Sequence, residues 1–490
     1  MIPYELLKES MDRENIFAKE HESYARHRAE HWDKLARRPS GALTKHYRNR
    51  LAEIYSHVAG ECESVLEMGC GRGELLKALN PREGVGVDLS EQMIVEAQRR
   101  YPEFQFICGD AQTIDLGDVT FDMIILSDLL NDLWDVQAVL MHIRRYCSEK
   151  TRIVLNVQSH VWESIRRLAQ TLGLVTPVMP QNWLTPIDVR NLVELSGFDL
   201  VRRWEEILSP LAVPLIAPLC DRVLVRMPFV RNAALTNFYV LRIHPQTIKR
   251  APAPTVSVII AARNEAGHID ELLRRIPEMG SHTEIIFVEG NSTDDTYEVI
   301  KRVIADSGRD CRLLKQQGKG KGDAVRTGFE AAKGDILMIL DADITVPPED
   351  LSRFFDVLSS GIGEFANGVR LVYSMEDDAM RFLNVLGNKF FSWAFSWLLG
   401  QPIRDTLCGT KVLWATDYLK IAGGRNYFGD FDPFGDFDLL FGAARQNLKI
   451  MEVPIRYRAR RYGETNIQRW RHGWLLLKMV VFAARRIKFR

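Results

Sequence analysis

The chain lacks the cysteine patterns of a disulfide framework or a structural zinc site. Its seven cysteines are scattered over 490 residues, and no two of them form a Cys-x-x-Cys pair. An odd, unclustered set of this kind is typical of proteins kept in a reducing compartment. We therefore expect a cytoplasmic protein without structural disulfides.

The sequence also lacks a long apolar run and an excess of charge of one sign. No stretch reaches the roughly 18 consecutive apolar residues of a membrane-spanning helix, and residues 1–9 contain no apolar core of a signal peptide. Lys plus Arg and Asp plus Glu number 64 each, so overall charge gives no sign of a nucleic-acid partner. A basic exception is the segment from Arg456 onward, which carries eleven Lys or Arg residues against one acid, Glu464.

A chain of this length exceeds one ordinary core, and its pattern divides it into two halves. Apolar, β-branched segments at 64–68 and 255–260 each begin a run in which strand-like and helix-like stretches alternate. This alternation predicts parallel sheets covered by helices, an α/β class in both halves. The predicted organisation is a domain over 1–248 with a helical cap over about 1–50, a Pro/Ala-rich linker over 249–254, and a second domain over 255–490.

The first half contains a glycine-rich turn directly after its first strand. Glu67 precedes Gly69, Gly71 and Gly73, and a helix-like pattern follows. Glycines let the backbone approach a ligand closely, and the helix start offers unpaired N–H groups. The spacing G-x-G-x-G differs from the G-x-G-x-x-G of dinucleotide sites, so the ligand need not carry a pyrophosphate. A nicotinamide site and a turn without any ligand remain alternatives.

Polar residues also end the next three strands of this half, at Asp88, at Asp110-Ala111 and at Ser127-Asp128. Ligands of open α/β sheets bind at such strand ends. The order of motifs over about 40–248 resembles class I S-adenosylmethionine-dependent methyltransferases, which have a Rossmann-like fold. The resemblance implies that Glu67 and the three glycines hold the methionine end of the cofactor and Asp88 its ribose. By the same likeness Asp110 and Ala111 meet the adenine, unless Asp110 is only a turn residue, and Ser127 and Asp128 line the methyl-transfer pocket.

The catalytic group of this half is open. Methyl transfer is an in-line displacement that needs positioning and, for a hydroxyl acceptor, a base. His160 and Trp162 follow the fifth strand and could face the acceptor, although a structural role on a loop is the favoured interpretation of His160. The first half could also be a non-catalytic cofactor-binding or scaffold module.

The second half has an ordered set of polar strand ends. Its first strand runs into Ala261-Ala-Arg263-Asn264-Glu265, and its second ends at Glu289. A glycine-rich basic loop with Lys319 and Lys321 follows, and it suits a diphosphate.

The fourth strand of this half delivers Asp341-Ala-Asp343. Two carboxylates one residue apart, next to a diphosphate site, suit a hard divalent cation such as Mg²⁺ or Mn²⁺. Such an ion offsets the charge that develops on a leaving nucleoside diphosphate.

These motifs resemble the family-2 glycosyltransferases of GT-A fold over about 254–470, in the branch of dolichyl-phosphate mannosyltransferases and polyprenyl-phosphate sugar transferases. Further motifs that carry the likeness are Asp405-Thr-Leu-Cys-Gly409-Thr-Lys411, Gly435-Asp436-Phe-Asp438 and Arg460-Arg-Tyr-Gly463. The resemblance implies that Ala261 and Arg263 to Glu265, with Glu289, hold the nucleoside, while Asp341 and Asp343 bind the metal. It also implies that Arg460 assists the phosphates and that Asp436, or else Asp438, is the base of an inverting transfer.

The expected acceptor is a lipid phosphate or a glycan. Two apolar segments, 382–399 and 474–484, suit helices lying at a bilayer surface, the second with a basic flank, although core packing or dimerisation explains them as well. We therefore expect a bifunctional enzyme that is cytoplasmic or attached peripherally to the cytoplasmic membrane face. The alternative is a glycosyltransferase with a non-catalytic first half and a soluble acceptor.

Overall fold

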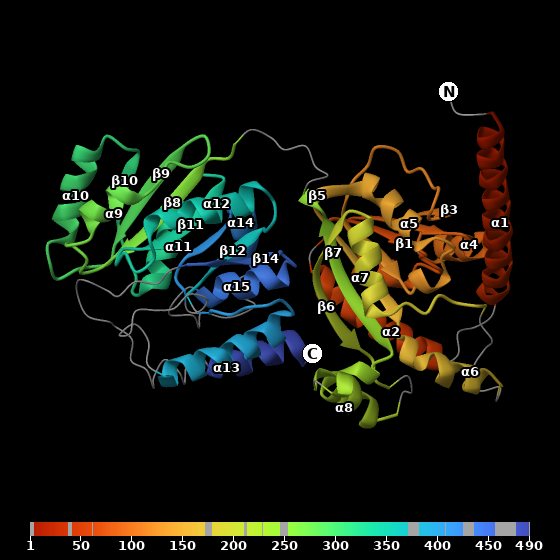
Figure 1. Ribbon diagram of the computed structural model, residues 1–490. Helices are drawn as coiled ribbons and strands as arrows, with labels where there is room; N and C mark the ends of the chain where they lie inside the picture. Colours follow the sequence, from red (N-terminus) through yellow and green to blue (C-terminus); the bar gives the residue numbers. More distant parts are fainter. Residues whose placement is uncertain are drawn as a thin grey trace. The chain divides into compact units, whose positions relative to one another are not determined.

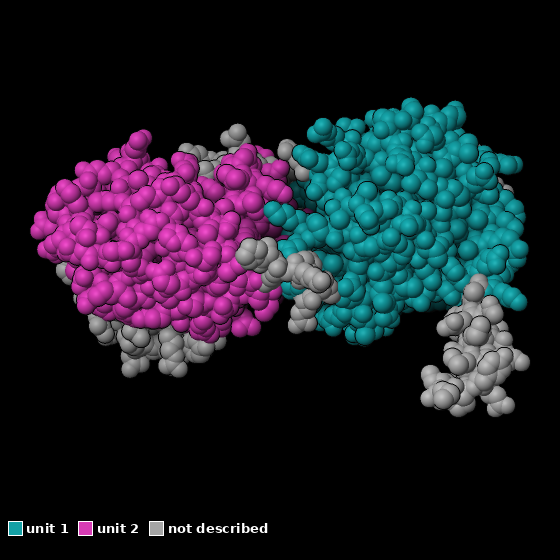
Figure 2. Space-filling model, turned by 90° about the horizontal axis from the view of Figure 1, so that it is seen from above, with its two compact units in different colours: residues 1–247 teal, residues 248–490 magenta. Residues whose placement is uncertain are grey.

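The structure is a computed structural model of the whole chain. It describes residues 4–37, 42–60, 62–171, 179–209, 213–227, 229–245, 253–370, 382–406, 408–424, 436–455 and 477–489. The chain divides into two compact units, Met1–Thr247 and Ile248–Arg490, which Figure 2 shows in different colours. Each unit is described by itself.

Unit 1 is built on a seven-stranded sheet with the order β3-β2-β1-β4-β5-β7-β6. Its strands are β1 (Ser64–Met68), β2 (Glu83–Asp88), β3 (Gln105–Cys108), β4 (Phe121–Ser127), β5 (Cys147–Gln158), β6 (Phe198–Glu206) and β7 (Thr236–Ile243). The strands β3, β2, β1, β4 and β5 are parallel, whereas β7 is antiparallel to both β5 and β6. The sheet is therefore mixed, and this departs from the wholly parallel sheet that the alternation predicted.

Helices flank this sheet (Figure 1). They are α1 (Tyr4–Ala36), α2 (Ala42–Ala59), α3 (Glu74–Leu79), α4 (Glu91–Arg100), α5 (Val136–Ile143), α6 (Glu163–Thr171), α7 (Pro186–Leu195) and α8 (Ile216–Arg222), with short turns η1 (Leu130–Asp132), η2 (Arg144–Tyr146), η3 (His160–Trp162), η4 (Leu224–Arg226) and η5 (Val230–Ala233). One part of the core packs α2 on the sheet through Leu51, Ile54, Tyr55 and Val58. The polar stretch before the first sheet is thus helical and contributes an apolar face to the core.

Unit 2 has a second seven-stranded sheet, with the order β10-β9-β8-β11-β13-β12-β14. Its strands are β8 (Val256–Ala262), β9 (Thr283–Glu289), β10 (Cys311–Lys315), β11 (Ile336–Asp341), β12 (Phe365–Val369), β13 (Lys411–Trp414) and β14 (Ile450–Pro454). Strand β13 is antiparallel to β11 and β12, and the other pairs are parallel. The central strands read as continuous apolar runs because helices cover both of their faces.

The helices of unit 2 are α9 (Ile269–Arg275), α10 (Thr296–Ser307), α11 (Lys321–Ala331), α12 (Leu351–Ser359), α13 (Phe382–Leu399), α14 (Ala415–Gly423) and α15 (Asp436–Arg445), with the turn η7 (Pro348–Asp350). A last helical stretch, 477–483, runs into the π-helical turn η9 (Ala484–Lys488). None of the helices in the described ranges is long and apolar enough to cross a membrane.

Candidate functional site

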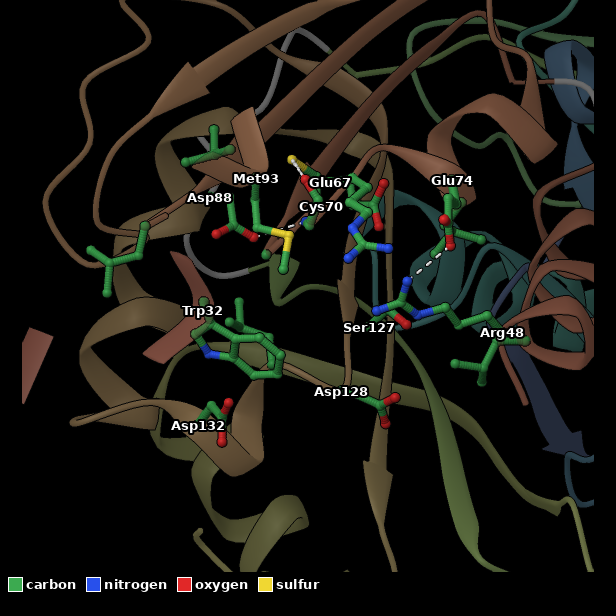
Figure 3. Close-up of a pocket in the computed structure, with 18 of the residues that line it drawn as sticks. Trp32, Arg48, Glu67, Cys70, Glu74, Asp88, Met93, Ser127, Asp128 and Asp132 are labelled. Carbon is green, nitrogen blue, oxygen red and sulfur yellow. Dashed lines mark hydrogen bonds and ion pairs between the residues drawn. The ribbon is translucent and has the colours of Figure 1, made fainter. Parts of the chain in front are cut away.

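A cavity of about 750 Å³ lies at the carboxyl ends of β1, β2 and β4 in unit 1. Figure 3 shows several of its lining side chains, among them Trp32, Asp88 and Asp128. The residues predicted to hold the cofactor or to line the methyl-transfer pocket all line this cavity except Gly73; they are Glu67, Gly69, Gly71, Asp88, Asp110, Ala111, Ser127 and Asp128. The parallel order of the strands brings these ends together although they are about 60 residues apart in sequence.

The glycine turn has a backbone conformation that only glycine adopts readily. Gly69, Gly71 and Gly73 have φ values of 78°, 51° and 73°, all in the left-handed region that favours glycine. A Cβ on Gly71 would meet no atom within 4 Å, so this glycine faces open space, whereas one on Gly73 would lie 2.7 Å from the ring of Phe106. Gly71 therefore opens the cavity, and Gly73 serves the packing of the turn.

Two acids, the buried Glu67 and the half-buried Asp88, hold this turn in place. Glu67 Oε2 accepts a hydrogen bond of 3.1 Å from the Leu76 amide, and burial raises the pKa of Glu67 well above its usual value. The Asp88 carboxylate accepts the Gly71 amide at 2.8 Å and the Ser90 amide at 2.9 Å, and burial raises its pKa as well. Both carboxylates thus position the backbone around the cavity.

Helix α1 closes one side of the cavity, which the sequence did not indicate. His21 Nε2 lies 3.0 Å from Asp110 Oδ2, and Asp33 accepts a 2.5 Å hydrogen bond from the Ser90 hydroxyl. The Arg72 side chain donates to the carbonyls of residues 35 and 36, at 2.9 and 3.0 Å. Trp32 of the same helix lines the cavity (Figure 3). No local pattern could have predicted these long-range contacts.

Asp128 is held by a polar network behind the cavity wall. Tyr47 Oη donates to its carboxylate at 3.0 Å, and Asn156 Nδ2 donates at 2.6 Å. The Asn156 oxygen in turn accepts from Tyr55 and Ser127, which fixes the orientation of the amide. Burial raises the pKa of Asp128 to about 6, against the lowering effect of its two hydrogen bonds. A carboxylate with this pKa can accept a proton near neutral pH.

The other candidate of the first half does not reach this site. His160 is exposed on η3 and does not line the cavity, and the Trp162 indole donates to the Ala233 carbonyl at 2.9 Å. The alternative of a structural position for both residues therefore fits the structure.

In unit 2 the predicted nucleotide residues lie at the ends of β8 and β9, which pair in parallel. Asn264 has φ of 57°, its amide is bonded to the Ser292 hydroxyl, and its side chain accepts the Thr293 amide at 2.8 Å. Glu289 Oε1 accepts the Ser292 amide at 2.5 Å. Arg263 is exposed and Ala261 is half-buried. The two strand ends thus form one polar edge.

Glu265 behaves differently from its neighbours. Its carboxylate is buried and lies 2.9 Å from His268 Nδ1, and its amide is bonded to Thr296. The observed contacts of Glu265 therefore stabilise the fold of this loop.

The basic loop meets the carboxylate pair at the end of β11. Lys321, at the start of α11, forms an ion pair with Asp341, while Lys319 is exposed. Asp343 Oδ1 accepts from the Thr345 hydroxyl at 2.8 Å and from its amide at 3.2 Å. A Cβ on Gly409 would collide with both Asp341 and Lys321, so the Asp405–Lys411 motif packs directly on this pair.

Asp341 stands in a strongly positive environment. Burial raises its pKa, but Lys321, Lys411 and Arg370 together lower it below its usual value. Arg370 forms a two-bonded ion pair with Asp405, at 2.7 and 2.8 Å, and Lys411 is fully buried. Within the described ranges no three His, Cys, Asp or Glu side chains are grouped to hold a metal.

Of the two predicted candidates for the base, the structure describes the side chain of Asp438 but not that of Asp436. Asp436 is the first residue of α15, but its side chain is outside the described residues, as is Arg460. Asp438 is half-buried on the same helix and lies 3.8 Å from Arg326 of α11.

Two family models match the chain, one in each unit. Residues 65–150 match the methyltransferase domain family, and residues 257–407 match glycosyl transferase family 2. The matched ranges begin with β1 and β8 and include Asp88, Asp128 and the Asp341–Asp343 pair.

Three curated proteins illustrate the similarity. Glycosyltransferase AglJ of Haloferax volcanii is 28% identical over 46% of this chain and 71% of its own length. Dolichyl-phosphate hexose transferase of the same organism is 28% identical over 46% of this chain and 92% of its own length. Undecaprenyl-phosphate 4-deoxy-4-formamido-L-arabinose transferase of Edwardsiella ictaluri is 33% identical over 43% of this chain and 62% of its own length.

The chain is therefore an enzyme of the transferase class. It carries a methyltransferase domain followed by a family-2 glycosyltransferase domain, as the motifs predicted. The predicted fold class, a Rossmann-like α/β domain followed by a GT-A α/β domain, is confirmed by two α/β units that match these families in this order.

Proposed function

We propose that the chain is a bifunctional enzyme. Unit 1 transfers a methyl group from S-adenosylmethionine, and unit 2 transfers a sugar from a nucleotide sugar to a lipid phosphate, with inversion and with a divalent cation. The observation that carries this proposal is the presence, at the strand ends of each unit, of an ordered polar site that coincides with a matched transferase family.

The cavity of unit 1 fits the proposed cofactor. The open space above Gly71 admits a ligand against the backbone, and the carboxylates of the lining, which stand beside five Lys and Arg side chains, suit a molecule with a sulfonium and an ammonium charge. When bound, the cofactor supplies an electrophilic methyl group. Gly69, Gly71 and the Glu67-supported turn hold its methionine end, and Asp88 faces the ribose. Asp110 and Ala111 border the adenine, with Gly73 packing the turn beneath, and Ser127 borders the acceptor space.

The carboxylates at the end of β11 fit a divalent cation whose remaining ligands come from the phosphates of a bound nucleotide. Mg²⁺ is commonly bound by one or two carboxylates together with phosphates, and Asp341 and Asp343 supply two. When bound, Mg²⁺ or Mn²⁺ offsets charge on the diphosphate. Ala261, Arg263, Asn264 and Glu289 border the nucleoside, Glu265 supports that edge, and Lys319 and Lys321 face the phosphates. Arg460, which lies outside the described residues, is the further cation proposed to assist them.

Asp436 is the proposed base for a hydroxyl acceptor, with Asp438 as the neighbouring choice. For a lipid phosphate, which is ionised at neutral pH, the same carboxylate orients the acceptor instead of removing a proton.

A lipid acceptor is supported by the names of two relatives, a dolichyl-phosphate and an undecaprenyl-phosphate transferase. It is also supported by an apolar surface of unit 2, where α13 and η9 are in contact. The ring centroids of Trp397 and Phe489 lie 5.9 Å apart there. Phe390, Trp393, Val481 and Phe489 are exposed there beside Arg485 and Arg486. Apolar side chains with a basic rim suit peripheral attachment to the cytoplasmic membrane face.

The experiment that tests the sugar transfer is a donor screen. Release of nucleoside diphosphate is measured for a panel of nucleotide sugars with Mg²⁺ or Mn²⁺, with and without polyprenyl phosphate. We expect one donor to be turned over in a manner that depends on the lipid phosphate. Turnover with a water-soluble glycan and not with the lipid would favour the alternative of a soluble acceptor.

The second candidate function keeps the glycosyltransferase and makes unit 1 a binding or scaffold module. The observation that favours it is the absence, within the described lining, of His160 or another histidine beside Asp128. Calorimetric titration with S-adenosylmethionine separates the possibilities at the level of binding, because a pure scaffold gives no heat.

A further inference from the structure

The connection between β6 and β7 in unit 1 exposes many apolar side chains and buries some of its charged ones. The chain between β6 and β7, residues 213–227 and 229, carries α8 and lies beyond the ends of these two strands (Figure 1). Leu215 is 87% exposed and Phe229 is 93% exposed. Five more apolar side chains of this connection are exposed: Val213, Ile216, Leu219, Val223 and Met227. A monomer in water rarely gathers so many large apolar side chains on its surface.

Two charged side chains of the same connection, Asp221 and Arg226, point inward. Asp221 is buried, and its Oδ1 accepts the amides of Leu208 and Ser209 at 2.7 and 2.8 Å. Arg226 forms a 2.6 Å ion pair with the buried Glu206. A helix packed on a water-soluble domain normally buries its apolar side and exposes its charges. Here polar anchors fix the connection to the unit, and the apolar side chains face outward.

The charges at this surface favour an anionic lipid bilayer. The charged side chains exposed among residues 213–227 and 229–233 are Arg222 and Arg231, and no acid is exposed there. Cations beside protruding Leu and Phe side chains match a surface of anionic headgroups over hydrocarbon. A symmetric contact with a second copy would place the arginines of both copies together without an exposed acid of this surface to pair with them.

The connection also emerges at the edge of the sheet where the cavity lies. Thr236, the first residue of β7, is level with Gln158 at the end of β5 and with Glu206 at the end of β6. Because β5 is parallel to β4 and β1, these residues share the edge that carries Asp88 and Asp128.

Helix α2 joins the cavity to the connection. Asn49 and Leu51 line the cavity, whereas Arg50, between them, contacts the Asp221 carbonyl at 3.4 Å and Glu206 at 3.6 Å. A surface held against a bilayer by the connection would therefore bring the cavity close to that bilayer.

We infer that residues 213–227 and 229 form a bilayer contact of the methyltransferase unit, and that its methyl acceptor is a lipid-linked molecule. This inference rests on the proposed function of unit 1 and extends it by naming the class of acceptor. Both transfers would then act on membrane-borne substrates, each unit through a surface of its own.

The test uses the full chain with vesicles of phosphatidylglycerol and phosphatidylcholine, and with vesicles of phosphatidylcholine alone. Hydrogen exchange is followed by mass spectrometry over 213–229. Vesicle partitioning and S-adenosylmethionine affinity are measured for the wild type, for Leu215→Ser with Phe229→Ser, and for the control Val95→Ser with Leu195→Ser, which alters exposed apolar residues on α4 and α7.

We expect anionic vesicles to slow exchange over 213–229. The Leu215 and Phe229 variant should partition at least tenfold less than the control, with unchanged cofactor affinity. Protection confined to 477–489, equal partitioning of both variants, or protection that grows with protein concentration without vesicles would each overturn the inference. If vesicles protect 213–229 but no protein binds S-adenosylmethionine, the bilayer contact stands and the proposed methyl transfer, with its acceptor, falls.

Discussion

The two units place their candidate sites at the same position in the fold but complete them in different ways. In unit 1 the strand-end acids bind backbone amides of the turn, and α1 and α2 enclose a cavity around them. In unit 2 the strand-end acid Asp341 pairs instead with a cation of the neighbouring loop. The first site is thus a preformed cavity, whereas the second is a sheet edge at which an acid is already paired with a lysine.

This difference shows what each ligand must supply. A ligand of unit 1 enters a cavity whose polar groups already have partners, so it gains mainly from fit and from contact with the backbone. A cation at Asp341 must compete with Lys321, so it needs the phosphates of a nucleotide to complete its ligands. We expect four measurements to sharpen or break this comparison.

The largest effect should come from Asp343→Asn. Losing one of two carboxylates at the end of β11 should lower nucleotide-sugar turnover by roughly 100-fold or more, the scale found when one group that stabilises transition-state charge is removed. Cofactor affinity in unit 1 should not change. The exposed Asp306→Asn on α10 is the control, and a joint loss of turnover and cofactor binding would show that the two sites are not independent.

Gly71→Arg should act on the other site. The substitution introduces a side chain at a φ of 51° into open cavity space, so S-adenosylmethionine affinity should fall by roughly 100-fold, about 2.7 kcal/mol. Gly60→Arg is a matched control because Gly60 has φ of 60° and equally open surroundings away from the cavity. Equal affinities of the two variants in calorimetry would exclude the glycine turn as the binding site.

Asp128→Asn should change the pH dependence of unit 1. The pKa of Asp128 is about 6 in the folded protein against 3.8 ordinarily, so the unfolded chain loses this proton first as the pH rises. The ionised carboxylate then lowers the free energy of unfolding, and the effect develops between about pH 4 and pH 6. A rise from 3.8 to about 6 corresponds to about 3 kcal/mol.

Relative to the wild type, the Asp128→Asn variant should therefore gain up to about 3 kcal/mol between pH 4 and pH 7.5. The measurement is thermal unfolding of the transition that shifts with S-adenosylmethionine. Asp118→Asn, at an exposed site, should show no such gain. A constant difference between Asp128→Asn and wild type over this range would contradict the raised pKa.

The smallest effect is expected from Lys321→Met. Removing the cation paired with Asp341 should raise the protein's affinity for Mn²⁺ in the absence of nucleotide by roughly tenfold. The reason is that the positive charge of Lys321 no longer competes with the metal for the Asp341 carboxylate. Electron paramagnetic resonance of free Mn²⁺ measures this, with the exposed Lys301→Met as control. Unchanged or weaker binding would show that Lys321 does not compete with the metal.

Local patterns predicted much of both sites because their residues follow strands directly. Gly71 and Asp88 were predicted from a turn and a strand end, and parallel pairing then places both at one edge of the sheet. The same reasoning failed for Trp32 and Tyr47. Trp32 and Tyr47 lie 32 and 17 residues before the first residue of β1, and helical periodicity gives no information on what a polar face will meet.

The sequence by itself determined that the chain has two α/β units, that each carries an ordered set of polar strand ends, and that the two halves resemble a methyltransferase and a family-2 glycosyltransferase. Short-range chemistry suffices there, because a glycine turn or a pair of aspartates has its meaning within a few residues. The tertiary structure alone decided that α1 and α2 enclose the first site, that Lys321 pairs with Asp341, and that the β6–β7 connection turns its apolar side outward. Each of these depends on contacts between distant segments, which packing selects and no local pattern encodes.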